Sequence, residues 1–235
     1  MLNEFIALDL ETTGLDAKKD KIIEIGAVRF QNNVPVARFQ TYVQPGRELE
    51  NRITELTGIT DEMLKGQPVF EEVAESLLDF LGSDVLLGHR VLFDYAFLKR
   101  AYAYLRVPFE RQGIDTLKIA RVCLPDLESR RLGDLCRHYQ IPLVAHRASE
   151  DAMAAGILYG KMTAEFEKAA AEMPEALVYK VRKDCAATKA QKEQLARLLK
   201  ECQTIPAYEI EKMTRSEASR EIERLLQQIR LTHQK

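Results

Sequence analysis

This 235-residue sequence lacks several features that would by themselves indicate a class of protein. It holds only four cysteines, with no C-x-x-C pair and no zinc-ligand spacing, which argues against a disulfide framework and a zinc site. No apolar run approaches the roughly 18 residues that a membrane helix needs, and no basic segment opens the chain. The glycine motifs G-x-x-x-x-G-K-[ST] and G-x-G-x-x-G are also missing. We therefore expect a soluble, cytoplasmic protein that is not a nucleotide-binding switch.

The sequence also lacks an excess of charge of either sign. It contains 34 basic and 36 acidic residues, a net charge of −2, which excludes a globally basic nucleic-acid coat but allows a local basic groove. Charged residues make up 30% and hydrophobic residues 46%, a composition typical of globular rather than disordered chains. The length predicts one large domain with, at most, a small partner.

The order of hydrophobic patterns predicts a mixed α/β fold. Strand-like segments come first, at 4–10, 22–31 and 34–44, with Asn32-Asn33 as a hairpin turn between the last two. The apolar period then changes to three and four residues, which is typical of amphipathic helices. The expected elements from there are a helix at 69–81, a strand at 84–88, a helix at 92–105, a strand near 114–115, a helix through 119–123, and helices at 132–139 and 149–172. Such an order predicts a mixed sheet with helices on its faces.

The C-terminal part of the sequence reads as a separate helical module. Pro174 interrupts the long helix, so we expect a main domain at 1–172 and a linker at 173–187. Beyond the linker, Thr188-Lys-Ala-Gln and Thr214-Arg-Ser-Glu match the capping-box pattern of helix N-termini. Residues 188–235 are therefore predicted to form a small helical module.

Two acidic residues on the first strand could share a cation. Asp9 and Glu11 are two positions apart, so both side chains point to one face of the strand, with Cα atoms about 6.6 Å apart. Gly14 follows them and would let backbone approach a ligand closely. The alternative is a strand that simply runs into a polar turn.

Two further acids stand at predicted helix starts. Asp94 lies in the first turn of the helix that follows a strand, where the helix dipole favours an acid in any case. Asp151 lies five residues after His146, and the two can converge if His146 is in the loop and Ser149 caps the helix. A capped helix beside an exposed histidine is the ordinary alternative.

Taken together, these segments form an ordered set of motifs. They read Asp-x-Glu-Thr-Thr-Gly, then Gly-His-x-x-x-Phe-Asp, then His-Arg-Ala-x-x-Asp. The set resembles the three exonuclease motifs of the DEDD superfamily. Because a histidine stands five residues before the last aspartate, the sequence resembles the DEDDh subgroup in particular. This subgroup includes the proofreading epsilon subunits of bacterial DNA polymerase III. The resemblance spans about residues 3–165. It implies a ribonuclease H-like mixed β-sheet flanked by helices, with 1–172 as the catalytic domain.

The resemblance also implies a reaction and its residues. It indicates a metal-dependent 3′→5′ exonuclease that hydrolyses single-stranded or frayed DNA ends to nucleoside 5′-monophosphates. Two Mg²⁺ or Mn²⁺ ions, which prefer oxygen ligands, would be held by four carboxylates. His146 would accept a proton from the attacking water near neutral pH. The implied catalytic residues are Asp9, Glu11, Asp94, His146 and Asp151, and the implied substrate-binding residues are Thr12, Thr13, Gly14, Leu15, His89 and Phe93.

Other interpretations stay open at this stage. For Phe93, ordinary core packing against Phe97 is as good an interpretation as base stacking. Thr57 and Arg90 stand where similar proteins often carry His and Asn, and both departures bear on substrate contacts rather than on metal binding. The alternative functions are a 3′→5′ exoribonuclease and a non-catalytic nucleic-acid-binding accessory protein of a polymerase. A DNA polymerase or repair partner is implied, while its identity and the oligomeric state are left open.

Overall fold

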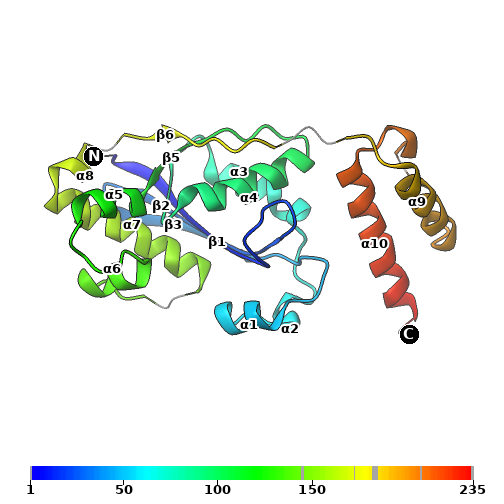
Figure 1. Ribbon diagram of the computed structural model, residues 1–235, viewed down its shortest axis with the longest axis horizontal. Helices are drawn as coiled ribbons and strands as arrows, with labels where there is room; N and C mark the ends of the chain where they lie inside the picture. The colour runs from blue at the N-terminus through cyan, green and yellow to red at the C-terminus, as the bar shows by residue number, and fades with distance from the viewer. Residues whose placement is uncertain (1, 144–145, 172, 182–184, 207, 234–235) are drawn as a thin grey trace. The chain divides into compact units, whose positions relative to one another are not determined.

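The first part of the structure is built around a six-stranded sheet (Figure 1). The computed structural model describes residues 2–143, 146–171, 173–181, 185–206 and 208–233. It divides into two compact units, Met1–Tyr179 and Lys180–Lys235. The strands of the first unit are β1 (Glu4–Thr12), β2 (Ile22–Gln31), β3 (Val34–Tyr42), β4 (Leu86–Gly88), β5 (Gln112–Asp115) and β6 (Glu175–Ala176). Its helices are α1 (Asn51–Thr57), α2 (Asp61–Leu64), α3 (Phe70–Leu81), α4 (Val91–Tyr104), α5 (Thr116–Cys123), α6 (Leu132–His138), α7 (Ala148–Glu165) and α8 (Glu167–Ala170).

The sheet is mixed, in the order β3-β2-β1-β4-β5-β6. The hairpin β2–β3 and the pair β1–β2 are antiparallel, β4 and β5 continue parallel to β1, and β6 closes the sheet antiparallel to β5. Asn32 and Asn33 adopt φ of 51° and 62° in the hairpin turn, as their tolerance of positive φ predicts. The predicted fold class, a mixed sheet flanked by helices, is confirmed.

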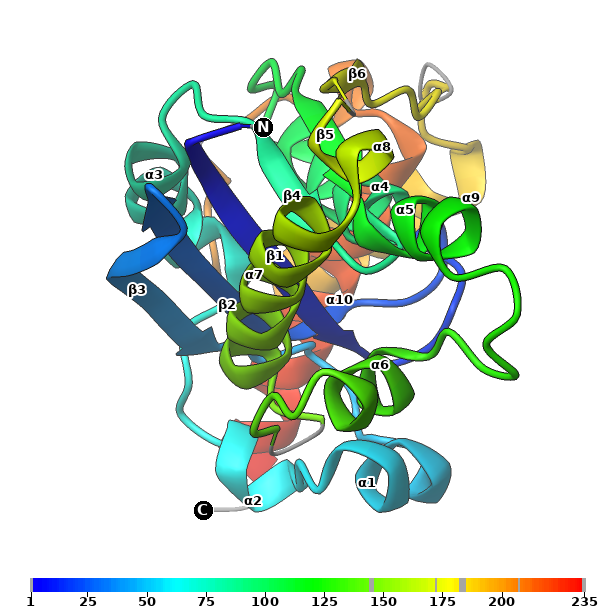
Figure 2. The same cartoon turned by 90° about the vertical axis from the view of Figure 1, so that its left-hand side faces the viewer.

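Strand parity decides which side chains face which helix layer. On β1, Ile6, Leu8 and Leu10 belong to a core cluster with residues of α3 and α4. Phe5 and Ala7 belong to a second cluster with residues of α5, α6 and α7, and Figure 2 shows α7 lying across β1 and β2. Because side chains alternate along a strand, the odd-numbered acids Asp9 and Glu11 lie on the α7 face.

The boundaries differ from the sequence prediction at the end of the first unit. The helix expected at 149–172 ends instead at Phe166, whose extended backbone (φ −121°, ψ 120°) separates α7 from α8. The Phe166 side chain packs against the second core cluster, so tertiary contact overrides helix continuation here. The predicted linker at 173–187 contains β6, which pairs with β5 at Gln112 and Gly113.

Helices α1 and α2 have no counterpart among the predicted elements. They contain seven and four residues, too few for a periodic apolar pattern to stand out. Their buried side chains, including Ile53 and Leu64, join a small apolar cluster with Ile23 of β2. Packing against the sheet adds to local capping signals, namely the left-handed Gly58 after α1 and the Thr60 N-cap of α2, which the sequence prediction did not use.

The second unit has its own apolar core. It contains α9 (Lys189–Glu201), a 3₁₀ turn η1 (Ile210–Lys212) and α10 (Arg215–His233). Both capping boxes form: Thr188 with Gln191, and Thr214 with Glu217. The buried residues of its core are Ala187, Leu195, Leu198, Leu199, Met213, Ala218, Ile222 and Leu225. Across the described residues of both units, every helix is too short or too polar to cross a lipid bilayer.

Candidate active site

Three acidic side chains from two elements converge at one end of the sheet. Asp9 and Glu11 come from β1, and Asp151 comes from the first turn of α7. One carboxylate oxygen from each lies within 4.8 Å of those of the other two. Asp151 is buried, and the other two are half-buried. A single hard cation could therefore contact all three carboxylates.

Asp94 approaches the same place from the opposite face of the sheet. It lies in the first turn of α4 and is buried, with Oδ1 accepting a hydrogen bond of 3.0 Å from the backbone N–H of Leu10. Strand β4 ends at Gly88, so this N–H of β1 is satisfied by a side chain instead of a strand. Asp94 is outside the 4.8 Å group of three but close enough to Asp9 for their charges to repel.

The electrostatics of the cluster show a shortage of positive charge. Burial, followed by repulsion from Asp94 and Asp151, raises the pKa of Asp9 well above its ordinary value. Burial, followed by repulsion from Asp151 and Glu24, raises the pKa of Glu11 to about 8. The pKa values of Asp94 and Asp151 are raised as well, in both cases chiefly by burial. A cation would reverse these shifts, because it favours the charged form of every carboxyl group around it.

The donor set fits a hard divalent cation. Every side chain of the group offers carboxylate oxygen, the ligand type that Mg²⁺ and Mn²⁺ prefer, and no sulfur or imidazole ligand belongs to the group among the described residues. The raised pKa values of Asp9 and Glu11 follow from the same crowding of carboxyl groups.

His146 sits at the edge of this cluster, just before α7. Its backbone has φ of 63°, and its N–H donates to Oδ2 of Asp151 at 2.8 Å. Its side chain is exposed to solvent, where it can meet a water molecule or a substrate. The prediction that Ser149 caps the helix is wrong: α7 begins at Ala148 with Arg147 at the N-cap position, and the hydroxyl of Ser149 is buried within the first turn.

A fifth acid, Glu24, was not among the predicted site residues. It pairs with Glu11 in the β1–β2 register, is fully buried, and accepts hydrogen bonds from Gln40 Nε2 (2.9 Å) and from the backbone N–H of Ala148 (3.2 Å). Its carboxylate also pairs with Arg147 at 3.4 Å. A signal was present in the sequence, because Glu24 is the one charged residue in the apolar run 22–28.

Gly26 lets the start of α7 sit directly on the sheet. It lies opposite Asp9 in the strand register. A Cβ atom at this position would stand 2.2 Å from the backbone of Ala148 and of Ser149. Gly26 and Glu24 together therefore hold the N-terminus of α7 against β2, which brings Asp151 to Asp9 and Glu11.

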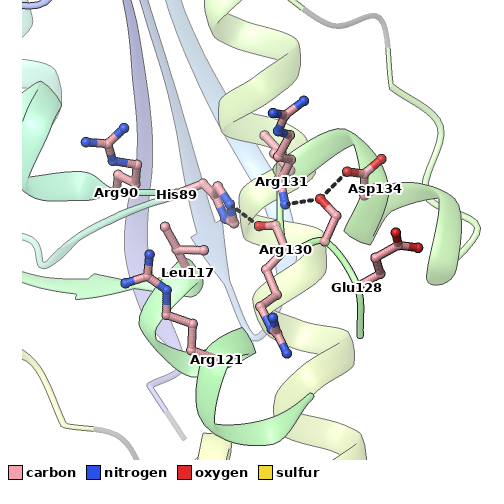
Figure 3. Close-up of a pocket in the computed structure, with 10 residues that line it drawn as sticks. His89, Arg90, Leu117, Arg121, Glu128, Arg130, Arg131 and Asp134 are labelled. Carbon is pink, nitrogen blue, oxygen red and sulfur yellow. Dashed lines mark hydrogen bonds between the residues drawn. The ribbon is translucent and has the colours of Figure 1, made fainter. Parts of the chain in front are cut away.

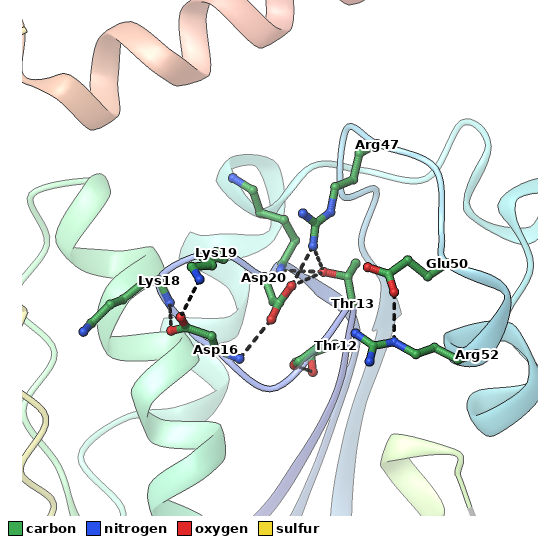
Figure 4. A network of polar contacts seen from close by, with 11 residues as sticks. Thr12, Thr13, Asp16, Lys18, Lys19, Asp20, Arg47, Glu50 and Arg52 are labelled. Atoms are coloured by element: carbon green, nitrogen blue, oxygen red, sulfur yellow. Dashed lines mark hydrogen bonds and ion pairs between the residues drawn. The ribbon is translucent and has the colours of Figure 1, made fainter. Parts of the chain in front are cut away.

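The predicted substrate segment at residues 12–15 forms a tightly bonded loop (Figure 4). Thr12 and Thr13 are buried, and the hydroxyl of Thr12 donates to the Gly14 carbonyl at 2.6 Å. The hydroxyl of Thr13 contacts Asp20 and Arg47, which also pair with each other. The two threonine side chains thus serve the loop itself. Leu15 is different, because 86% of its surface is exposed.

The other two predicted substrate residues also have partners within the protein. Both ring nitrogens of His89 are engaged. Nδ1 contacts Thr116 Oγ1 at 3.0 Å, and Nε2 contacts the Arg130 carbonyl at 2.9 Å, the second of which is drawn in Figure 3. Burial lowers the pKa of His89, which favours the neutral ring. The ring centroid of Phe93 lies 5.1 Å from that of Phe97, and Phe93 packs against the first core cluster. Phe93 is half-buried, so part of its ring packs on the core and its predicted contact with substrate stays a prediction.

Comparisons with known proteins agree with this architecture. Several solved structures share the fold of the first unit. Exonuclease X in complex with 5′ overhanging duplex DNA matches with a TM-score of 0.57 and 22% identity, covering 69% of this chain and 93% of that one. The nuclease domain of 3′hExo, a DEDDh family member bound to rAMP, matches with a TM-score of 0.59 and 20% identity over 69% of this chain and 92% of that one.

Sequence relatives are closer. A PolC-type DNA polymerase III from Halalkalibacterium halodurans is 43% identical over 162 residues, which is 68% of this chain but 11% of that protein. A DNA polymerase III epsilon subunit from Aquifex aeolicus is 36% identical over 163 residues, 68% of this chain and 81% of that protein. The chain thus spans about a ninth of the length of the PolC-type relatives. The family model described as exonuclease (RNase T type) matches residues 6–159, and the chain therefore belongs to this exonuclease family.

Proposed function

We propose that this protein is a metal-dependent 3′→5′ exonuclease that acts on single-stranded or frayed DNA ends and releases nucleoside 5′-monophosphates. The observation that carries the proposal is the convergence of Asp9, Glu11 and Asp151 within 4.8 Å, in a cluster whose carboxyl groups repel one another. Membership of the exonuclease family supports the reaction, and relatives named as DNA polymerase III proteins support DNA as the substrate.

The residues of the cluster have distinct proposed roles. Asp9, Glu11, Asp94 and Asp151 would hold two Mg²⁺ or Mn²⁺ ions. Such ions offset the charge of a phosphodiester and stabilise the attacking and leaving oxygens. The Leu10 N–H fixes the orientation of Asp94, and the His146 N–H fixes that of Asp151, so both carboxylates are held in place before any ligand binds.

His146 is the proposed general base. Its side chain is exposed and close enough to Asp151 for their charges to interact, and imidazole is the side chain that most often accepts a proton from water in hydrolytic sites. Leu15, exposed at the tip of the loop next to the cluster, is the proposed apolar contact for the terminal base.

The relatives suggest the setting in which the enzyme works. Proteins named as PolC-type polymerases and as an epsilon subunit contain a similar segment, which supports trimming of 3′ ends during DNA replication or repair, alongside a polymerase. Residues 188–235, which lie beyond the matched segment, are proposed to be dispensable for hydrolysis of short strands.

Digestion of end-labelled strands tests this proposal. Single-stranded DNA and RNA of the same sequence, labelled at the 5′ end, are incubated with Mg²⁺, Mn²⁺ or EDTA. We expect a ladder shortened from the 3′ end with Mg²⁺ or Mn²⁺ and none with EDTA, and faster digestion of DNA. Asp9→Asn should abolish the ladder, whereas Glu75→Gln, an exposed acid on α3, should keep it. Faster digestion of RNA would make the protein an exoribonuclease, and cutting of circular strands would exclude an exonuclease.

A further inference from the structure

A basic pocket is lined by residues that follow β4, by residues of α5 and by the segment that leads into α6 (Figure 3). It has a volume of about 760 Å³, and four of its ten lining residues are arginines: Arg90, Arg121, Arg130 and Arg131. Its acidic lining residues are Glu128 and Asp134. Asp134 is already engaged by Arg137 and Ser129, so the pocket has a surplus of positive charge.

The arginines of this pocket divide into two kinds. Arg130 is structural: its guanidinium donates to the Leu124 carbonyl at 2.8 Å and also to that of Pro125, and its own carbonyl receives His89. Arg90, Arg121 and Arg131 are exposed, and within the described part of the chain none of the three pairs with a carboxylate. These three guanidinium groups are therefore available to a ligand.

Backbone hydrogen bonds to Asp115 fix the points from which two of these arginine side chains extend. Arg90 has a left-handed backbone (φ 76°), and its N–H donates to Oδ1 of Asp115 at 3.0 Å. The same oxygen of Asp115 caps α5 by accepting from the Leu117 N–H at 2.9 Å. Leu117 and Arg121 are four residues apart on α5, so they share the helix face that lines the pocket. A single carboxylate thus sets Arg90 and α5 relative to each other.

Sheet register places the pocket next to the proposed metal ligands. His89 and Arg90 directly follow β4, whose Leu87 pairs with Ala7 of β1 in the parallel ladder. Asp9 comes two residues after Ala7, and Asp115 is paired with Gly88 at the end of β5. The carboxyl ends of β1, β4 and β5 therefore meet at one edge of the sheet, where β1 carries Asp9 and where the chain after β4 and β5 leads to Arg90 and Arg121.

We propose that Arg90, Arg121 and Arg131 bind backbone phosphates of a single-stranded nucleic acid, upstream of the 3′ nucleotide that lies at the carboxylate cluster. This inference rests on the proposed function and adds to it a second contact with the substrate. The planar fork of a guanidinium group matches phosphate oxygens in bidentate fashion. The charge of the pocket also offsets the repulsion that a polyanion meets at Asp9, Glu11 and Asp94.

The lining favours a strand over a free nucleotide. The three available arginines come from the start of α4, from α5 and from the segment before α6, so they are distributed around the pocket rather than clustered on one phosphate. The lining contains no Phe, Tyr or Trp on which a lone base could stack. Several phosphates spaced along one strand can contact arginines distributed in this way better than the single phosphate of a mononucleotide can.

The test measures binding without hydrolysis. Affinities of fluorescent single-stranded DNA of 3 and 12 nucleotides are measured by anisotropy in EDTA over a range of salt, with the full-length protein and its Arg121→Gln/Arg131→Gln variant. The control is Arg100→Gln, which removes a guanidinium stacked over Tyr104 outside the pocket. Matching melting temperatures exclude misfolding.

For the 12-mer we expect the double variant to bind about tenfold more weakly. The slope of log affinity against log salt concentration should be smaller by about 1.4, or 0.7 for each lost phosphate contact. The 3-mer should change less, and Arg100→Gln should resemble the wild type.

Two results would overturn the proposal. One is an unchanged affinity and salt slope for the 12-mer. The other is that AMP binding depends on Arg121 and Arg131 whereas 12-mer binding does not. In that case the ligand of the pocket would be a free nucleotide. Hydrolysis by the wild type with Mg²⁺ is measured separately. If hydrolysis is absent but the arginine dependence holds, only the proposed function fails; if hydrolysis is present but the dependence is absent, only the pocket proposal fails.

Discussion

The carboxylate of Glu24 accepts a hydrogen bond of 3.2 Å from the backbone N–H of Ala148, the first residue of α7. This contact joins the second strand of the sheet to the helix that carries Asp151. It is fully buried, and the same carboxylate pairs with Arg147. Glu24 is thereby a positioning residue for Asp151 and His146, although it is itself absent from the group of three converging acids.

Replacing Glu24 tests this role. Glu24→Ala leaves the Ala148 N–H and Arg147 without their buried acceptor, which costs about 1–3 kcal/mol in the free energy of unfolding. Glu24→Gln keeps the size of the side chain but only one of the two acceptor oxygens, since Oε1 accepts from Gln40 and Arg147 and Oε2 from Ala148, so it should recover part of the loss. Urea unfolding gives the stabilities, and initial hydrolysis rates give kcat and KM. We expect kcat to fall more for Ala than for Gln, and equal kcat in all three proteins would refute the positioning role.

A pair of glycine substitutions tests the close packing of α7 on β2. Gly26→Ala should destabilise the fold, by about 1–3 kcal/mol or more, because its Cβ would meet the α7 backbone at 2.2 Å. Gly133→Ala is the matched control on α6, where an added Cβ meets nothing within 4 Å and where Ala favours the helix by up to about 1 kcal/mol. Thermal unfolding should therefore shift in opposite directions. A neutral Gly26→Ala would contradict the contact.

The metal-free protein should lose stability as the pH rises. The pKa of Glu11 is raised from 4.5 to about 8 in the folded state, so the folded protein binds this proton more tightly than the unfolded chain does. That contribution is fully present below pH 4.5 and is lost as the pH passes through about 8. Melting temperatures in EDTA should therefore decline between about pH 5 and 8, and Mg²⁺ should reverse the decline. Glu11→Gln should make the decline in EDTA shallower without removing it, because the pKa values of Asp9, Asp94 and Asp151 are raised as well, and an unchanged slope in this variant would assign the effect to those groups alone.

Truncation distinguishes the end of the first unit from the predicted end at 172. Leu177 is buried in the first core cluster, packs on Gly113, and donates its N–H to the Arg111 carbonyl at 2.9 Å. A chain ending at 172 loses these contacts and should be less stable than one ending at Tyr179, by about 2–5 kcal/mol, the usual cost of removing a buried leucine side chain. Equal melting temperatures would contradict this role of Leu177. The chain ending at Tyr179 should still digest short strands.

Local signals predicted much of the fold. The strand at 22–31 and the hairpin at Asn32-Asn33 follow from β-rich composition and tolerance of positive φ, and the structure has both. The break at Phe166 and the pairing of β6 could not be read from the sequence. Both depend on contacts with distant residues: the core cluster for Phe166, and β5 for Glu175 and Ala176.

The site was predictable in part for a similar reason. Strand parity put Asp9 and Glu11 on one face, and motif order added Asp94, His146 and Asp151. The register between β1 and β2 places Glu24 opposite Glu11 and Gly26 opposite Asp9. This register depends on the packing of the whole fold, so the local sequence does not predict it. Thr12 bonds to the Gly14 carbonyl in its own loop, and Thr13 bonds to Asp20 and to Arg47 after β3, contacts that spacing alone does not indicate.

Titration of Mn²⁺ by electron paramagnetic resonance, alongside hydrolysis of labelled DNA, tests the central claim most directly. The claim is that Asp9, Glu11 and Asp151 form one cation site that is required for removal of 3′ nucleotides. The wild type and Glu75→Gln should bind Mn²⁺ and digest the strand. Asp9→Asn and Asp151→Asn should lose Mn²⁺ affinity and hydrolysis together while remaining folded. Undiminished Mn²⁺ binding in these two variants, or hydrolysis at the wild-type rate, would contradict the account.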